Sequence, residues 1–381
     1  MSIALQKTCS LLLLILIGFL LKNRLVKDEH KKGLKTIILD LALPAMIFVA
    51  LLKIEVDSEL MFLPLLILVW NVTMLLTSKF TLPLLGFSKD SAEMRTWLLM
   101  IPSLAPGLSC FPFLLEYLGE DALAWGALAD IGNKVYVLIF SYLLAMSWYY
   151  KHMGLGSRSN GQKVKELILS MFQEPINLVI LVALLLLSFG LRLENLPGFI
   201  SESILMLKDV MTPLVLLFIG VSVILKREQI QSIASVLILR AGFSLVLSAG
   251  FIALVDLPSE AAVLLAVVFP LSACSFWPFA HMSAVRHLER DKEIEVEHGT
   301  FDLGLGINIL AVSLPMSTVL ILGVFSSGSY FTVPLHVLTV GSVMILVPLI
   351  PRVFSWIRNL EFTIPFLDQK ELKDSSAESR S

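Results

Sequence analysis

Two apolar stretches of the sequence combine prolines with small polar residues, and this combination could hold a small ligand inside a membrane. The first reads PSLAPGLSCFPF over 102–113, and the second reads FPLSACSFWPF over 269–279. A proline inside a helix removes a backbone hydrogen bond and clashes with the preceding turn, at a cost of about 3 kcal/mol. In hydrocarbon, the freed backbone groups persist only where protein or water supplies partners. Each stretch therefore predicts a broken helix that exposes partial charges to a buried site.

The candidate ligand contacts are the prolines and the small residues between them. A single proline in an apolar segment is more often a simple kink, but two mirrored sets with small polar residues favour a binding site. The predicted substrate-binding residues are Pro106, Gly107, Ser109, Cys110, Pro112, Pro270, Ser272, Cys274, Ser275 and Pro278.

Charged residues inside apolar segments form a second candidate group, since each costs about 2.5 to 3.5 kcal/mol at the centre of a membrane helix. Asp130 and Lys134 lie four residues apart, so they share one helix face and can pair. The pair is either structural or one that exchanges its partners with a coupling proton or sodium ion. The predicted ion-coupling residues are Asp130, Asn133, Lys134, Asp302 and Asn308.

Three further ionisable residues leave alternatives open. Arg240 could meet a ligand carboxylate or extend to the cytoplasmic interface. His281 is expected as a polar helix-end residue rather than a proton relay, and Glu116 as an interfacial carboxylate. No nucleophile stands at catalytic spacing from a base, and there is no metal-ligand cluster or phosphate loop. We therefore expect no enzymatic activity, no catalytic residue, no metal and no bound cofactor.

The composition indicates an all-α polytopic membrane protein, because 56% of the residues are hydrophobic and only 16% are charged. The net charge of -2 gives no indication of a nucleic-acid partner. Apolar stretches separated by short polar loops predict eleven spans. They cover 8–21, 33–52, 60–86, 96–119, 121–150, 167–190, 202–225, 232–255, 259–285, 300–325 and 331–355.

The distribution of basic residues predicts the orientation in the membrane. Odd-numbered loops contain eighteen lysines and arginines, whereas even-numbered loops contain three, Lys53, Arg192 and Lys208. Basic loops stay in the cytoplasm, so the odd loops are expected inside and the N-terminus outside. The basic residues after the last span place the C-terminus in the cytoplasm too, which requires an odd number of spans. The chain is thus expected as a multi-pass protein of an inner or plasma membrane.

Landmarks recur at a near-constant interval along the chain, which predicts an internal repeat. The interval is 169 residues from Pro44 to Pro213, 166 from Pro112 to Pro278, and 172 from Asp130 to Asp302. Five spans per unit make the second unit inverted, so that spans four and nine meet near mid-membrane. The expected organisation is a first repeat over 1–150, a cytoplasmic linker over 151–166, a second repeat over 167–325, an additional transmembrane helix over 326–356 and a cytoplasmic tail over 357–381.

The sequence resembles the auxin efflux carrier family of permeases over most of its length. The similarity is clearest in LLILIGFLLKNRLVKDEHKKGLKTIILDLALPAMIFVALL and in EPINLVILVALLLLSFGLRLENLPGFISESILMLKDVMTPLVLLFIGVSVIL. The resemblance implies an inverted 5+5 repeat with crossed, proline-broken helices 4 and 9, a fold shared with bile acid symporters and a class of sodium/proton antiporters. Two departures are the eleventh span and the first crossover, where many bacterial members carry an asparagine and a Gly-x-Pro.

Two classes of function are compatible with the sequence. The resemblance implies a secondary-active transporter of a small organic anion, such as a carboxylate or an auxin-like acid, coupled to H+ or Na+. The alternative is a membrane receptor or scaffold that keeps the fold without transport. The expected partners are the organic anion and the lipid bilayer, with a homodimer left open.

Overall fold

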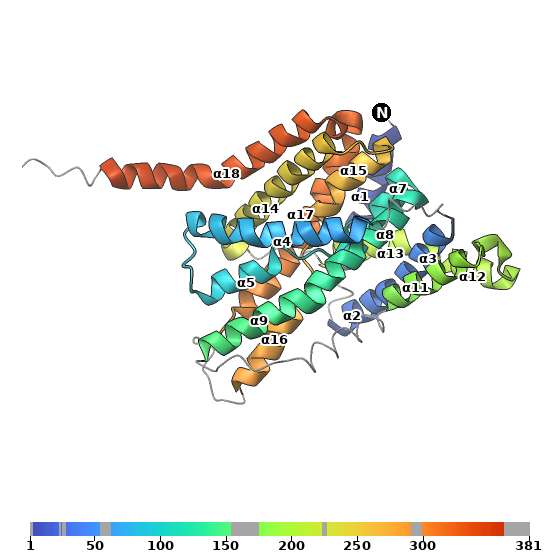
Figure 1. The fold of residues 1–381 in the computed structure, drawn as a ribbon, viewed down its shortest axis with the longest axis horizontal. Helices are drawn as coiled ribbons and strands as arrows, with labels where there is room; N and C mark the ends of the chain where they lie inside the picture. Colours follow the sequence, from blue (N-terminus) through green and yellow to red (C-terminus); the bar gives the residue numbers. More distant parts are fainter. Residues whose placement is uncertain are drawn as a thin grey trace, which may run out of the picture.

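The protein is all-helical in the computed structural model, which describes residues 3–22, 24, 28–53, 62–153, 175–222, 227–290 and 299–361 (Figure 1). No strand occurs within these ranges. The cytoplasmic linker is described only at its start, and the tail only up to residue 361. The predicted domain boundaries therefore stay predictions.

The first half of the chain is a series of helices interrupted at several points. It comprises α1 (Ile3–Leu21), α2 (Asp28–Ile37), a π-helical turn (Ile38–Ala42), α3 (Leu43–Lys53), α4 (Leu63–Thr81), a 3-10 turn (Leu82–Leu85), α5 (Ala92–Met100), α6 (Pro106–Ser109), α7 (Phe111–Leu118), α8 (Glu120–Val135), a π-helical turn (Tyr136–Phe140) and α9 (Ser141–His152).

The second half has the same character. It comprises α11 (Pro175–Ser188), a 3-10 turn (Leu193–Asn195), α12 (Gly198–Asp209), α13 (Met211–Ser222), α14 (Arg227–Leu254), α15 (Glu260–Val268), a 3-10 turn (Phe269–Leu271), α16 (Phe276–Arg290), α17 (Leu303–Ser326), a 3-10 turn (Gly328–Thr332) and α18 (Pro334–Glu361).

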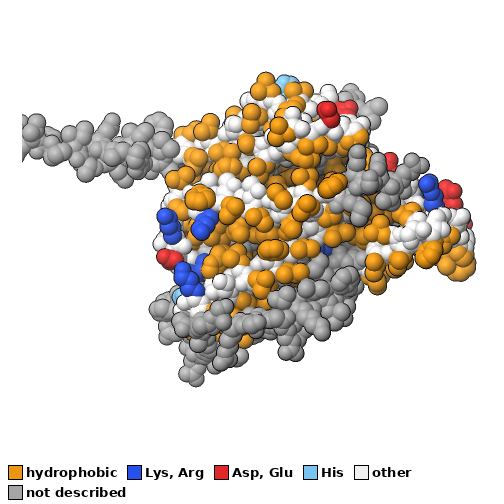
Figure 2. Space-filling model, in the orientation of Figure 1, with side chains coloured by type: hydrophobic (Ala, Val, Ile, Leu, Met, Phe, Trp, Pro, Cys, Tyr) orange, Lys and Arg blue, Asp and Glu red, His pale blue; other side chains and the backbone are white. Residues whose placement is uncertain are grey.

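Seven helical stretches within the described residues are long and apolar enough to cross a membrane, as expected of an integral membrane protein. They are Glu29–Lys53, Leu63–Leu85, Glu120–His152, Gly198–Val221, Gln231–Leu254, Glu260–Arg290 and Leu303–Ser326. Shorter apolar helices cover Cys9–Leu21, Leu178–Ser188 and Pro334–Ile350. Figure 2 shows one face of the molecule covered largely by hydrophobic side chains, with charged side chains toward its margins. Eleven crossings stay a prediction.

The helices pack into two sets of neighbours. In one set, α1 packs along α13, and α3 packs against α11 and α12. In the other, α4 packs against α8, and α14 lies beside α18 (Figure 1). The two sets meet where α3 contacts α8 and where α7 contacts α13.

Two close backbone contacts position the residues that follow them. A Cβ atom on Gly132 of α8 would lie 1.8 Å from the carbonyl oxygen of Pro64 at the start of α4, so only glycine fits there. Gly242 of α14 and Gly341 of α18 face each other, and a Cβ on Gly341 would lie 2.9 Å from the oxygen of Gly242. The first contact brings Asn133 against α4, and the second joins α18 to the helix that carries Arg240.

Candidate functional site

The two proline-containing stretches are non-helical over 102–105 and 272–275, and the two breaks lie against each other. The backbone N–H of Ala105 donates to the carbonyl oxygen of Ala273 at 2.8 Å, across 168 residues of sequence. Ser103 and Ser272, one in each break, are fully buried. Buried backbone groups that leave a helix need partners, and part of that need is met by the other break.

Serines satisfy more of the freed backbone groups. The Ser109 hydroxyl accepts from the N–H of Ala273 at 2.9 Å and donates to the carbonyl of Ala105 at 2.8 Å. The Ser103 hydroxyl accepts from the N–H of Ser275 at 3.0 Å and donates to the carbonyl of Met100 at 2.6 Å. Each hydroxyl thus links the two broken helices, using both its donor and its acceptor capacity.

Asparagines from two neighbouring helices hold the first break. The Asn133 side chain accepts from the N–H of Leu104 at 3.1 Å and donates to its carbonyl at 2.9 Å. The same amide donates to Asp130 Oδ1 at 2.8 Å. Asn71 on α4 donates to the carbonyl of Pro102 at 2.6 Å. A carboxylate in α8 is therefore connected to the first break through one side chain.

Arg240 on α14 joins the two breaks by its guanidinium. Its Nε donates to the carbonyl of Ile101 at 2.8 Å, and its two terminal nitrogens donate to Ser103 at 3.0 Å and Ser272 at 2.8 Å. The side chain is only 5% exposed. The option that Arg240 extends to the cytoplasmic interface is thus wrong, because its charge is engaged by backbone carbonyls inside the bundle.

The contacts of the two breaks correspond at the interval found in the sequence. Asn71 donates to the carbonyl of Pro102, and Arg240, 169 residues later, donates to that of Ser272, 170 residues after Pro102. Polar residues from α4 and α14 therefore perform the same task for equivalent carbonyls.

A second pair of contacts corresponds in the same way. Asn133 of α8 accepts from the N–H of Leu104, and Ser313 of α17 accepts from the N–H of Cys274 at 3.3 Å. Sequence reasoning missed Asn71, Ser103 and Ser313. A search for polar residues in apolar spans at the repeat interval would have found Asn71, since it precedes Arg240 by 169 positions.

The prolines lie beside the breaks rather than inside intact helices. Pro106 begins α6, Pro112 lies in the first turn of α7, and Pro278 lies in the first turn of α16. A proline is well tolerated there, because the N–H that it lacks would have no helical partner. Pro270 lies in the 3-10 turn before the second break. The expectation that the prolines occupy helix interiors is corrected accordingly.

The small residues of the predicted site lie close to the breaks. A Cβ on Gly107 would lie 2.7 Å from the Leu43 side chain, so α6 packs tightly on α3. Cys110 is fully buried between α6 and α7, and Cys274 lies within the second break. Ser275 also caps its own helix, accepting from the N–H of Trp277 at 3.3 Å.

The predicted ion-coupling residues are not all brought together. Asp130, Asn133 and Lys134 are buried in α8. Asp302 instead caps the start of α17, where its carboxylate accepts from the N–H of Leu305 at 2.9 Å. Asp302 is therefore not at the position that the symmetry with Asp130 predicted. Asn308 is half-buried on α17.

Two other ionisable residues differ from expectation. His281 is buried within α16, and its Nε2 lies 2.9 Å from the carbonyl oxygen of Val137 in the π-helical turn. It is therefore not a helix-end residue but a partner for an irregular stretch of backbone. Glu116 lines a cavity between α1, α7 and the α12–α13 junction. Within the described ranges, no three His, Cys, Asp or Glu residues are grouped as metal ligands.

Comparison with known proteins gives one informative match. The chain is 25% identical over 214 residues to a protein of Methanocaldococcus jannaschii named as an uncharacterized transporter. The match covers 55% of this chain and 66% of that protein, so it spans slightly less than two thirds of the relative. No protein family profile matches the chain.

Proposed function

We propose that the protein is a secondary-active transporter of a small organic anion, which binds where the two helix breaks meet. The observation that carries the proposal is Arg240, a buried positive charge hydrogen-bonded to both breaks. A guanidinium has five N–H donors, and the three bonds to Ile101, Ser103 and Ser272 leave two. Two remaining donors in a planar fork suit a carboxylate.

The arrangement supports alternating access by an inverted five-helix repeat. Equivalent contacts at Pro102 and Ser272 recur at the repeat interval, and broken helices that meet in a membrane bundle are typical of transporters. The similarity to a protein named as a transporter points in the same direction. A substrate carboxylate would compete with the carbonyls of Ser103 and Ser272 for Arg240 and so loosen one break from the other.

Coupling to H+ or Na+ is assigned to α8. Asp130 is hydrogen-bonded to Asn133, and Asn133 is bonded to both backbone groups of Leu104 in the first break. A cation on the Asp130 carboxylate would weaken its acceptance from Asn133. The geometry at Leu104 would then change with the occupancy of Asp130.

Uptake into proteoliposomes tests the proposal. Labelled dicarboxylates and indole acids are supplied with and without an imposed proton or sodium gradient. We expect gradient-driven accumulation of at least one anion by the parent protein, and its loss in Arg240→Gln. Arg192→Gln, which removes a charge from an exposed loop, is the matched control and should transport as the parent does. Binding of an anion without uptake by the parent would favour the receptor or scaffold instead.

A further inference from the structure

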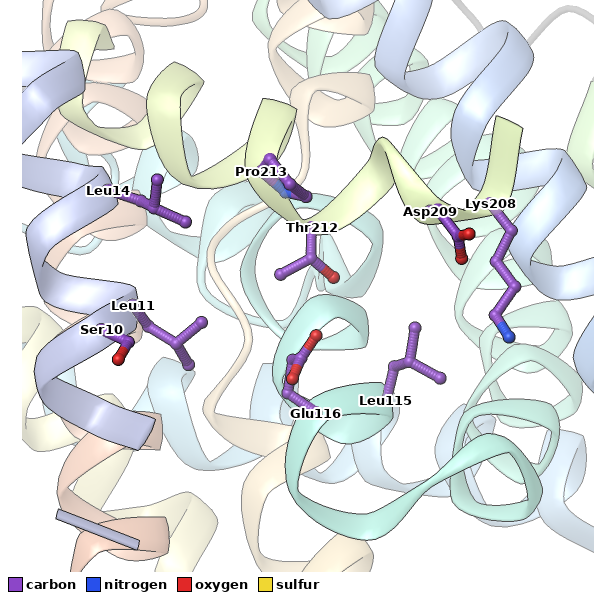
Figure 3. Close-up of a pocket in the computed structure, with 9 residues that line it drawn as sticks. All are labelled: Ser10, Leu11, Leu14, Leu115, Glu116, Lys208, Asp209, Thr212 and Pro213. Atoms are coloured by element: carbon purple, nitrogen blue, oxygen red, sulfur yellow. The ribbon is translucent and has the colours of Figure 1, made fainter. Parts of the chain in front are cut away.

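A second feature of the bundle lies away from the two breaks. A cavity of about 300 Å³ opens between α1, α7 and the junction of α12 with α13 (Figure 3). Its lining combines leucines with five polar or charged side chains, Ser10, Glu116, Lys208, Asp209 and Thr212. It also includes Pro213, so the Asp209 and Pro213 landmarks of the repeat both face this cavity. By the predicted orientation, the cavity lies on the outer side.

The charges around the cavity do not cancel. Lys208 forms an ion pair with Glu120 at the start of α8, and Glu120 also pairs with Lys53 at 2.8 Å. The two lysines and Glu120 together carry one positive charge. Glu116 and Asp209 add two negative charges, which leaves a net charge of -1 that a monovalent cation would balance.

Thr212 supplies an independent indication of a ligand. Its side chain is only 7% exposed and points into the cavity, near the carboxylates of Glu116 and Asp209 (Figure 3). No hydrogen bond of the Thr212 hydroxyl occurs within the described part of the chain. A buried hydroxyl without a partner costs free energy, so a bound ion or its water would stabilise it.

We propose that this cavity is a binding site for a small monovalent cation, with Glu116, Asp209 and Thr212 as the oxygen donors. Carboxylate and hydroxyl oxygens are the donors that hard cations prefer. The volume equals about ten waters at roughly 30 Å³ each, so the ion keeps part of its hydration. Of these donors, Glu116 lies on the outer half of the first broken helix, whereas the others lie on α12 and α13. A bound cation would therefore tie the two sets of helices together.

Thermal unfolding of the purified protein in nanodiscs tests the site without any transport measurement. The midpoint is measured in NaCl, KCl and choline chloride at equal ionic strength. We expect a saturable rise with NaCl that choline does not produce. In Asp209→Asn or Glu116→Gln, the half-saturating NaCl concentration should rise by at least about tenfold, the equivalent of one lost interaction of 1.4 kcal/mol. Thr212→Val should raise it less, and Thr212→Ser should restore it.

Controls separate the site from general effects. Glu194→Gln removes an exposed carboxylate outside the cavity and should respond to NaCl as the parent does. The midpoint in choline chloride shows whether each variant is folded. An equal rise with choline, or an unchanged NaCl response in all cavity variants, would overturn the proposal. A role of this cation in coupling rests on the proposed transport, but binding is read without substrate, so the two can fail separately.

Discussion

Replacement of Arg240 by glutamine is the most direct perturbation of the two breaks. Arg240 donates to the carbonyls of Ile101, Ser103 and Ser272, and it is the residue that contacts both broken helices through charge-assisted bonds. A glutamine amide has two donors, so at least one of these three buried carbonyls loses its partner.

The expected loss of stability follows from these contacts. Each buried acceptor left without a partner costs about 1 to 3 kcal/mol. The loss of the buried charge offsets part of this, because the guanidinium itself is costly to desolvate. We therefore expect Arg240→Gln to lower the free energy of unfolding by about 2 to 4 kcal/mol, within the range for loss of a buried polar network.

The measurement uses the buried cysteines as reporters. Cys110 and Cys274 are buried and become reactive to a thiol dye when the bundle opens, whereas Cys9 is exposed and is replaced by serine beforehand. Arg240→Lys keeps the charge but not the planar fork, so it should be less destabilised than Arg240→Gln and still defective in anion uptake. If Arg240→Gln unfolds and transports as the parent does, the reasoning about both breaks is refuted.

Three other changes test separate parts of the bundle. Ser109→Leu should abolish substrate binding and, because its hydroxyl bonds both breaks, destabilise the protein by about 2 to 5 kcal/mol from overpacking plus an unpaired N–H; Ser109→Ala, which lacks the added bulk, separates the two costs by thermal unfolding. If Asp130 couples an ion, Asp130→Asn with Lys134→Gln should regain stability but not gradient-driven accumulation, and accumulation at the parent level would remove Asp130 from the coupling site. Gly341→Leu should separate α18 from α14, lowering the unfolding midpoint, whereas a midpoint equal to the parent's would contradict the close contact at Gly242.

The sequence predicted the helices and both breaks because apolar length and proline position are local properties. The contact of 102–105 with 272–275 followed from the repeat interval, since an inverted pair of units brings equivalent segments together. Asn133 was also predicted, because an amide beside a buried Asp130 is unusual in an apolar span.

The partners of the breaks could not be predicted in the same way. Ser103 and Ser313 are common residue types in membrane helices, and only the tertiary structure determines whether their hydroxyls bond their own helix or another. Arg240 posed the same difficulty, because a long side chain in a span can reach either an interface or the bundle interior. Asp302 was misplaced because a match at the repeat interval fixes position along the chain, not depth in the bundle.

The pairing of α18 with α14 makes the thickness of the bilayer relevant to Arg240. Each helix has 28 residues, which corresponds to about 42 Å along its axis at 1.5 Å per residue. That exceeds the hydrocarbon core of about 30 Å, so apolar helices of this length adapt by tilting. Since Gly242 and Gly341 hold the pair together, a change of tilt moves both helices and carries the guanidinium with them. Lipids with longer or shorter acyl chains thus act mechanically on the position of Arg240.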